Sequence, residues 1–196
     1  MDDKVAIVNT HPGDNPGFVG KLSDFLASVG AEHHVIEGYE RPNPLEMDVR
    51  CVILTGVPMD VGYSLAQVET QRLIEQAFGW LRDYRRPVLG ICYGHQILAH
   101  VLGGRVSPLG EAVVDAQYSL VLQRAEGIFS GVKELCVFTE HRDYVSLVPQ
   151  GFVVVSRSNG VPYVIADPER EMYGVQFVPE RSDHRTREML RRFVLD

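Results

Sequence analysis

Short apolar runs alternate with amphipathic stretches through the first half of the chain. The continuous runs predict strands buried on both faces of a sheet, at 4–9, 33–36, 51–55 and 88–91. Apolar residues at helical spacing predict helices at 18–29, 65–84 and 93–102. Alternation of strands and helices is typical of a parallel sheet that helices cover on both faces.

The pattern changes after about residue 105, where turn residues instead of helices separate the apolar runs. These runs predict strands at 118–122, 135–139, 152–158, 164–166 and 173–177, and a last amphipathic stretch predicts a helix at 183–194. We therefore expect an α/β fold, with a mostly parallel sheet flanked by helices and additional antiparallel strands in the C-terminal half. No repeat or linker interrupts the sequence, so we expect one domain over residues 1–196.

Charge and hydropathy narrow the classes of function. The formal net charge of −7 disfavours nucleic-acid binding, because contacts to phosphates require clustered Lys and Arg. No apolar stretch approaches the roughly 18 residues that span a membrane, and the first residues lack the apolar core of a signal peptide. We expect a cytoplasmic protein that binds neither nucleic acid nor membrane. Nothing in the sequence indicates a metal site or a cofactor.

The three cysteines differ in their surroundings. They are too few and too widely spaced for a disulfide framework or a zinc site. Cys51 and Cys136 lie within apolar strand-like runs, so we expect both to be small buried side chains. Cys92 instead lies between two glycines, after a predicted strand and before a predicted helix. A turn of that kind exposes a sulfur atom, and the partial positive charge of the helix N-terminus stabilises a thiolate there.

Two motifs carry a family resemblance. The segment G-I-C-Y-G-H-Q at 90–96 and the segment G-V-Q-F-V-P-E at 174–180 resemble the signatures G-x-C-x-G-x-Q and G-x-Q-F-H-P-E of class I glutamine amidotransferases. The likeness to the amidotransferase subunit of GMP synthetase covers nearly the whole chain, including VILTGVP at 52–58 and the stretch around EHRD at 140–143. The resemblance implies a flavodoxin-like fold of the class I amidotransferase type. It also implies hydrolysis of glutamine or a related amide, with ammonia passed to a separate ATP-dependent synthetase subunit.

The same resemblance assigns roles to individual residues. Cys92 matches the nucleophile, and Glu180 matches the residue that orients the catalytic histidine. The residues that match the oxyanion hole, which binds the developing negative charge, are Gly56, Val57 and Tyr93. The residues at substrate-binding positions are Gln96, Glu140, His141 and Arg142.

The departures from the family pattern fall in the loops that should form the pocket. Val178 occupies the position of the catalytic histidine, and a valine side chain neither accepts nor gives a proton. General acid–base catalysis contributes roughly 10²–10⁴-fold to such reactions. Val57 and Arg142 replace glycines of the family, and a β-branched residue disfavours a positive φ. Without an imidazole to orient, a buried Glu180 needs another partner, for which Arg142 and Arg181 are the candidates.

Three hypotheses follow from this sequence. The first is an amidotransferase subunit whose glutaminase activity is impaired or lost, with His141 as the candidate substitute base. The second is a catalytically silent relative that binds a partner or a small ligand, since the scaffold is kept while the pocket loops diverge. The third is a hydrolase or transferase that uses Cys92 on another substrate, selected by Glu140 and Arg142.

Overall fold

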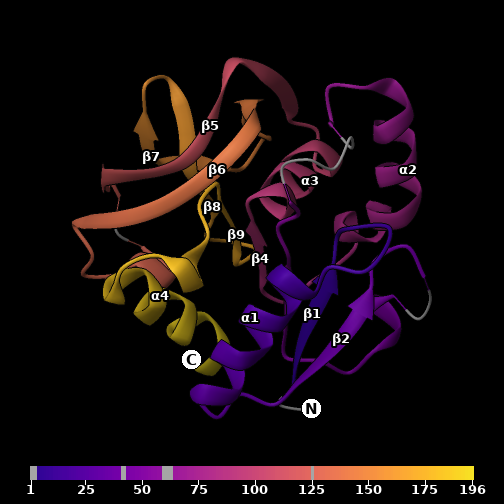
Figure 1. Cartoon of the computed structure of the whole chain (residues 1–196). Helices are drawn as coiled ribbons and strands as arrows, with labels where there is room; N and C mark the ends of the chain where they lie inside the picture. The colour runs from indigo at the N-terminus through magenta and orange to yellow at the C-terminus, as the bar shows by residue number, and fades with distance from the viewer. Residues whose placement is uncertain (1–3, 41–42, 59–63, 125) are drawn as a thin grey trace.

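A computed structural model describes residues 4–40, 43–58, 64–124 and 126–196 of the chain. Its main sheet has seven strands in the order β2-β1-β3-β4-β9-β8-β7 (Figure 1). The first five run parallel to one another, β8 pairs antiparallel with β9, and β7 pairs antiparallel with β8. The strands of this sheet are β1 Val5–Asn9, β2 His33–Glu37, β3 Cys51–Leu54, β4 Val88–Ile91, β7 Val153–Ser158, β8 Val161–Asp167 and β9 Met172–Val175. The predicted fold class is therefore confirmed.

Helices cover both faces of this sheet. They are α1 Pro16–Ser28, α2 Val68–Phe78, α3 Tyr93–Val101 and α4 His184–Leu195. Figure 1 shows α1 and α4 on one side of the sheet and α2 and α3 on the other. The buried apolar residues form two clusters that match this division, one with side chains from α1 and α4 and one with side chains from α2 and α3. The continuous apolar strands are explained by this double coverage, since β1, β3, β4 and β9 each contribute side chains to both clusters.

A long two-stranded ribbon lies beside the main sheet. Its strands are β5 Arg105–Val121 and β6 Glu134–Leu147, which pair in antiparallel register with several irregularities (Figure 1). The sequence predicted only the two ends that the segment between β5 and β6 joins, at 118–122 and 135–139. The rest of β5 was missed because it is largely exposed and carries Pro108 and Gly110. The irregularities let the ribbon pass these residues without ending. Its function in the fold is to bring residues 140–143 of β6 to the edge of the main sheet.

Two predicted elements are shorter than expected. The helix predicted at 65–84 is α2 followed at Gly79 by a tighter 3₁₀ turn, Gly79–Arg82. The strand predicted at 173–177 ends at Val175, because the chain then turns towards the ribbon. The backbone N–H of Val178 donates to the carbonyl of Phe138 in β6, at 3.0 Å. The segment after β9 is thereby held between the main sheet and the ribbon. Another 3₁₀ turn, Pro179–Arg181, follows it and leads to α4.

The glycine that follows the β4 turn sets the distance between α3 and the sheet. A methyl group on Gly94 would lie 2.4 Å from the backbone oxygen of Leu54 in β3, which no side chain tolerates. We expect Gly94→Ala to destabilise the fold by about 1–3 kcal/mol, because α3 must move away from β3. Urea denaturation followed by circular dichroism measures this change. The exposed Gly110→Ala is the matched control, since a methyl group there meets no atom within 4 Å. Equal stability of the two variants would contradict the close packing of α3.

Candidate functional site

Cys92 lies on a sharp turn between β4 and α3. Its φ of 52° and ψ of −104° are rare for a residue with a side chain, and such a conformation costs about 1–3 kcal/mol. A hydrogen bond of 2.8 Å from the Cys92 N–H to the Val175 carbonyl of β9 fixes the turn. The strand–turn–helix placement predicted for the cysteine is confirmed. The residue is buried, at 5% exposed, so the expectation that this turn exposes the sulfur is wrong.

The sulfur atom is surrounded by polar backbone and amide groups. Its hydrogen is within reach of the Glu140 carbonyl, at 3.6 Å, and the Gln176 side-chain amide donates to it at 3.8 Å. Burial raises the pKa of the Cys92 thiol to about 12, and the negative charges of Glu140 and Glu180 add to the effect. Hydrogen bonds from the Tyr93 N–H and the Gln176 amide lower the pKa of the thiol, but by less than burial raises it. The thiol is therefore protonated at neutral pH.

The turn after β3 lies directly beside the cysteine. A Cβ atom built on Gly56 would be 3.3 Å from the Cβ of Cys92 and 2.8 Å from the ring of Phe18. The side-chain amide of Asn15 donates to the Gly56 carbonyl at 2.9 Å and holds this turn in place. Val57 is not among the residues with a positive φ, so the strain expected there from a β-branched residue is absent. Gly56 thus adjoins Cys92, and Val57 follows it in the same turn.

A buried amide pair lies behind the sulfur. The side-chain amide of Gln96 in α3 donates to the Asp143 carbonyl at 2.8 Å and to the amide oxygen of Gln176 at 3.3 Å. Gln176 in turn reaches Cys92, so the two glutamines connect β6 to the nucleophile turn. Gln96 is therefore held inside the protein and does not project freely into a pocket. Gln176 was not among the predicted site residues, although its place in the G-V-Q-F motif was the signal that marked it.

His141 is buried beside this network, with both ring nitrogens engaged. Nδ1 is 2.9 Å from the Asp143 carbonyl, and Nε2 is 3.3 Å from the hydroxyl of Tyr163. Burial lowers the pKa of the imidazole below its ordinary value. To serve as a base for Cys92, the ring would have to give up one of these two partners.

Val178 and Glu180 lie at the end of the segment that follows β9. Val178 is 1% exposed. The Oε2 atom of Glu180 is buried and finds no hydrogen-bond partner within the described ranges. Burial raises the pKa of this carboxyl to about 7, and the charges of Lys21 and Arg181 only partly oppose the shift. Among the described residues no ion pair joins Glu180 to an arginine, so the pairing with Arg142 or Arg181 expected from the sequence is wrong.

A pocket of about 280 Å³ opens next to Val178. Four of the residues that line it are positions where the sequence departs from the family motifs, namely Val57, Glu140, Arg142 and Val178. The other lining residues are Phe18, Pro58 and Arg181, none of which was predicted as a site residue. Phe18 reaches the pocket because α1 starts beside the β3 turn, a long-range contact that leaves no local signal in the sequence.

The other two cysteines lie away from this pocket. Cys51 is buried as expected, and burial raises its pKa to about 12. Cys136 is exposed, so the expectation that it is buried is wrong. Its neighbours Leu135 and Val137 in β6 are buried, and alternate residues of a strand face opposite sides. The thiol of Cys136 therefore faces outwards.

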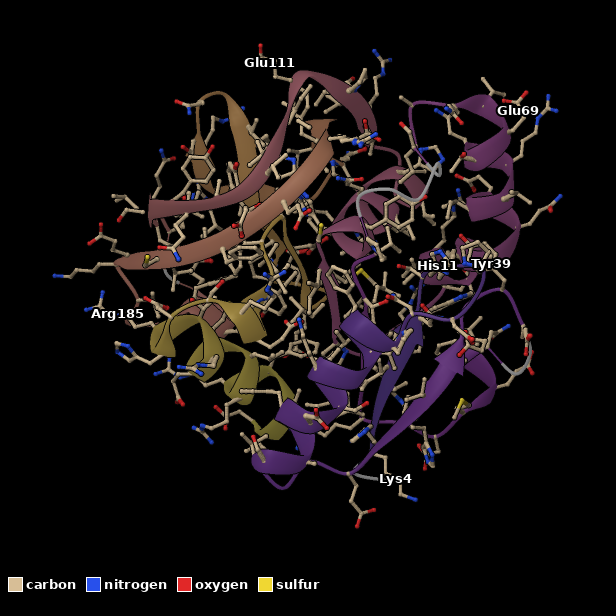
Figure 2. The ribbon with its side chains drawn as sticks, viewed as in Figure 1. Lys4, His11, Tyr39, Glu69, Glu111 and Arg185 are labelled. Atoms are coloured by element: carbon tan, nitrogen blue, oxygen red, sulfur yellow. The ribbon has the colours of Figure 1, made fainter. Side chains whose placement is uncertain are left out.

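The arginines of α4 are on the surface. Figure 2 shows Arg185 at the edge of the molecule, where its side chain donates to the Glu134 carbonyl of β6 at 3.3 Å. Arg191 and Arg192 pair instead with Glu188 on the same helix, at 2.8 Å and 3.4 Å. Within the described ranges, no three or more His, Cys, Asp or Glu side chains are grouped so as to hold a metal ion. None of the helices in that part of the chain is long and apolar enough to cross a membrane.

Comparison with known proteins agrees with this geometry. The family model described as glutamine amidotransferase class-I matches residues 14–196. GMP synthase [glutamine-hydrolyzing] from Streptococcus pyogenes serotype M5 (strain Manfredo) is 44% identical over 98 residues, and the protein of serotype M49 (strain NZ131) matches equally. Each match covers 48% of this chain and 19% of the relative, so the chain corresponds to a minor part of the length of these curated proteins.

Solved structures show the same fold. A GMP synthase subunit protein from Thermoplasma acidophilum superposes with a TM-score of 0.78 at 19% identity, covering 97% of this chain and 92% of its own. A glutamine amidotransferase from Thermotoga maritima superposes with a TM-score of 0.67 at 21% identity, covering 92% and 77% respectively. At these identities the two likenesses bear on the fold alone.

Proposed function

Since this chain belongs to the class I glutamine amidotransferase family, we propose that it is a GMP-synthetase-like amidotransferase subunit whose glutaminase activity is impaired or lost. The observation that carries the proposal is the buried Oε2 atom of Glu180, which has no hydrogen-bond partner among the described residues. In the family motif this carboxylate orients the histidine, and Val178 stands at the histidine position here. A buried carboxylate oxygen left without a hydrogen bond is what loss of an imidazole would produce.

The chemistry of the family defines what the remaining groups do. Attack on an amide carbonyl requires the thiolate of Cys92, and release of ammonia requires a proton for the leaving nitrogen. The Tyr93 N–H and the turn at Gly56 and Val57 are the groups proposed to stabilise the oxyanion. Cys92 keeps its proton at neutral pH, and Val178 offers no site to receive it. The site thus retains the positioning of the nucleophile and lacks its activation.

The substrate and partner follow from the family and its relatives. The relatives from Streptococcus pyogenes are named as glutamine-hydrolysing GMP synthases, which favours glutamine as the ancestral substrate of the site. A solved structure with the same fold is named as a GMP synthase subunit. On that ground we propose that this chain works with a separate ATP-dependent synthetase.

Alkylation by iodoacetamide tests the state of the nucleophile without partner or substrate. We expect Cys136 to react at pH 7.5 because it is exposed, and Cys92 to stay unmodified up to pH 9 because its thiol is protonated and buried. Peptide mass mapping across a pH series measures each site, with urea-unfolded protein as the control in which all three cysteines react. A Cys92 that reacts with a midpoint well below the reference pKa of about 8.5 would refute impaired activation.

A second candidate function is binding without catalysis. It is favoured by the pocket itself, because four lining residues differ from the family motifs while the strands that carry them are kept. A third candidate is a hydrolase or transferase that uses Cys92 on another substrate. It also requires an activated thiol, so the alkylation experiment tests it too. His141 remains the candidate substitute base, and the loss of glutamine hydrolysis on His141→Gln in a measurably active preparation would identify it.

A further inference from the structure

The pocket next to Val178 combines an apolar wall with two positive charges. Phe18, Val57, Pro58 and Val178 supply the apolar wall. Arg142 and Arg181 supply guanidinium groups, and Glu140 supplies one carboxylate. The formal charge of the lining side chains is therefore positive, although the chain as a whole carries −7.

Neither guanidinium group forms an ion pair with any described residue. Arg181 lies over the ring of Phe138, with its central carbon 3.7 Å from the ring centroid, which fixes the side chain at the pocket. Arg142 is exposed at the rim. In the part of the chain that the structure describes, no carboxylate lies within ion-pair distance of either arginine. A guanidinium group presents N–H donors in a planar fork that matches a carboxylate.

The remaining groups of the pocket offer little to a neutral amide. Val178 makes no hydrogen bond through its side chain, and the amides of Gln96 and Gln176 are engaged with each other and with the protein. Two guanidinium groups that form no ion pair with the described residues, together with an apolar wall, instead suit a short carbon chain with a carboxylate at each end. Glu140, at the same pocket, suits an ammonium group on that ligand.

We propose that this pocket binds a small dicarboxylate, held by Arg142 and Arg181, in preference to the neutral amide glutamine. The proposal rests on the proposed function, in which the pocket is the ligand site of a disabled amidotransferase, and it names the ligand class of that site. Binding needs no chemistry at Cys92, so it is measurable when the nucleophile is removed.

Calorimetric titration of the Cys92→Ala protein at constant ionic strength tests the preference. Glutamate and glutamine form a matched pair that differs only in the charge of the side-chain end, and succinate lacks the ammonium group. We expect glutamate or succinate to bind at least about tenfold more tightly than glutamine, as the loss of one charge-assisted hydrogen bond implies. Glutamine binding as tight as either, or no dicarboxylate binding in the millimolar range, would overturn the proposal. Inorganic phosphate binding as tightly as the dicarboxylates would also overturn it, since generic attraction of anions would then suffice.

Variants assign the binding to the two arginines. Arg142→Gln and Arg181→Gln should each weaken dicarboxylate binding about tenfold or more, whereas Arg187→Gln on the exposed surface of α4 should not. Arg142 is exposed, so its replacement is testable even where loss of the Phe138 contact lowers the stability of the Arg181 variant. Unchanged binding in Arg142→Gln would refute the assignment. The alkylation profile of Cys92 in the native chain reports on the proposed function separately, so the two proposals fail independently.

Discussion

Replacing Val178 with histidine should restore an ionisable nucleophile. The imidazole would stand beside the buried oxygen of Glu180, which has no partner, and a hydrogen bond to that oxygen would orient the ring. A protonated imidazole near the sulfur stabilises the thiolate, so the pKa of Cys92 should fall well below its value of about 12. We expect glutamine hydrolysis to rise by about 10²–10⁴-fold, the usual contribution of acid–base catalysis. Release of glutamate and the pH profile of Cys92 alkylation measure the two effects.

Three further variants make this result interpretable. Val178→Leu keeps the site apolar and should leave the thiol pKa unchanged. Adding Glu180→Gln to Val178→His should remove part of the gain, because the ring loses its charged acceptor. Adding Cys92→Ala should abolish it. If Val178→His neither lowers the thiol pKa nor raises hydrolysis, the pocket has diverged beyond the loss of a base, and the ligand-binding function gains support.

Replacing Glu180 with glutamine should stabilise the protein above neutral pH. The pKa of this carboxyl is raised from 4.5 to about 7 in the fold, so the folded state holds its proton more tightly than the unfolded chain. The stability of the native protein should therefore fall as pH rises from about 4.5 to about 7 and stay lower beyond. The pKa difference corresponds to about 3 kcal/mol at pH 8. Urea denaturation at pH 5, 6, 7 and 8 measures this, and Glu180→Gln should lack most of that decline.

The exposed Glu111 provides the matched control for this experiment. It lies in the exposed, irregular part of β5, and Figure 2 shows it at the outer edge of the molecule. Glu111→Gln removes the same charge without changing a buried group, so its stability should follow that of the native protein at every pH. A native protein that becomes more stable relative to Glu180→Gln between pH 5 and pH 8 would show that the carboxylate has a stabilising partner.

Most of the main sheet could be predicted from the sequence because its strands are short, apolar and double-covered. The predicted strand at 88–91 coincides with β4, and the turn at Cys92 follows from the same pattern. The ribbon was predicted only in part, since most of β5 is exposed and the later part of β6 places the polar residues His141 and Asp143 at alternate buried positions. Cys136 was predicted to be buried because cysteine is usually buried. It is exposed because alternate residues of β6 face opposite sides, and its neighbours Leu135 and Val137 face the core.

The site residues that lie in sequence motifs could be predicted. Those that reach the site only through contacts between distant segments could not. Cys92, Gly56 and Val57 come together because parallel strands end at the same edge of the sheet. The contribution of Phe18 depends on where α1 starts, and the position of Arg181 depends on the ring of Phe138. These are contacts between distant parts of the chain, which the pattern of one element does not encode.

The exposed thiol of Cys136 makes the native chain suitable for spectroscopy. Because Cys51 and Cys92 are buried with strongly raised pKa values, a maleimide fluorophore should attach at a single position without any substitution. That position is in β6, the strand that also carries Glu140 and Arg142 to the pocket. A dye at Cys136 therefore lies on the same strand as the pocket rim, and its emission offers a direct optical signal of ligand arrival and departure.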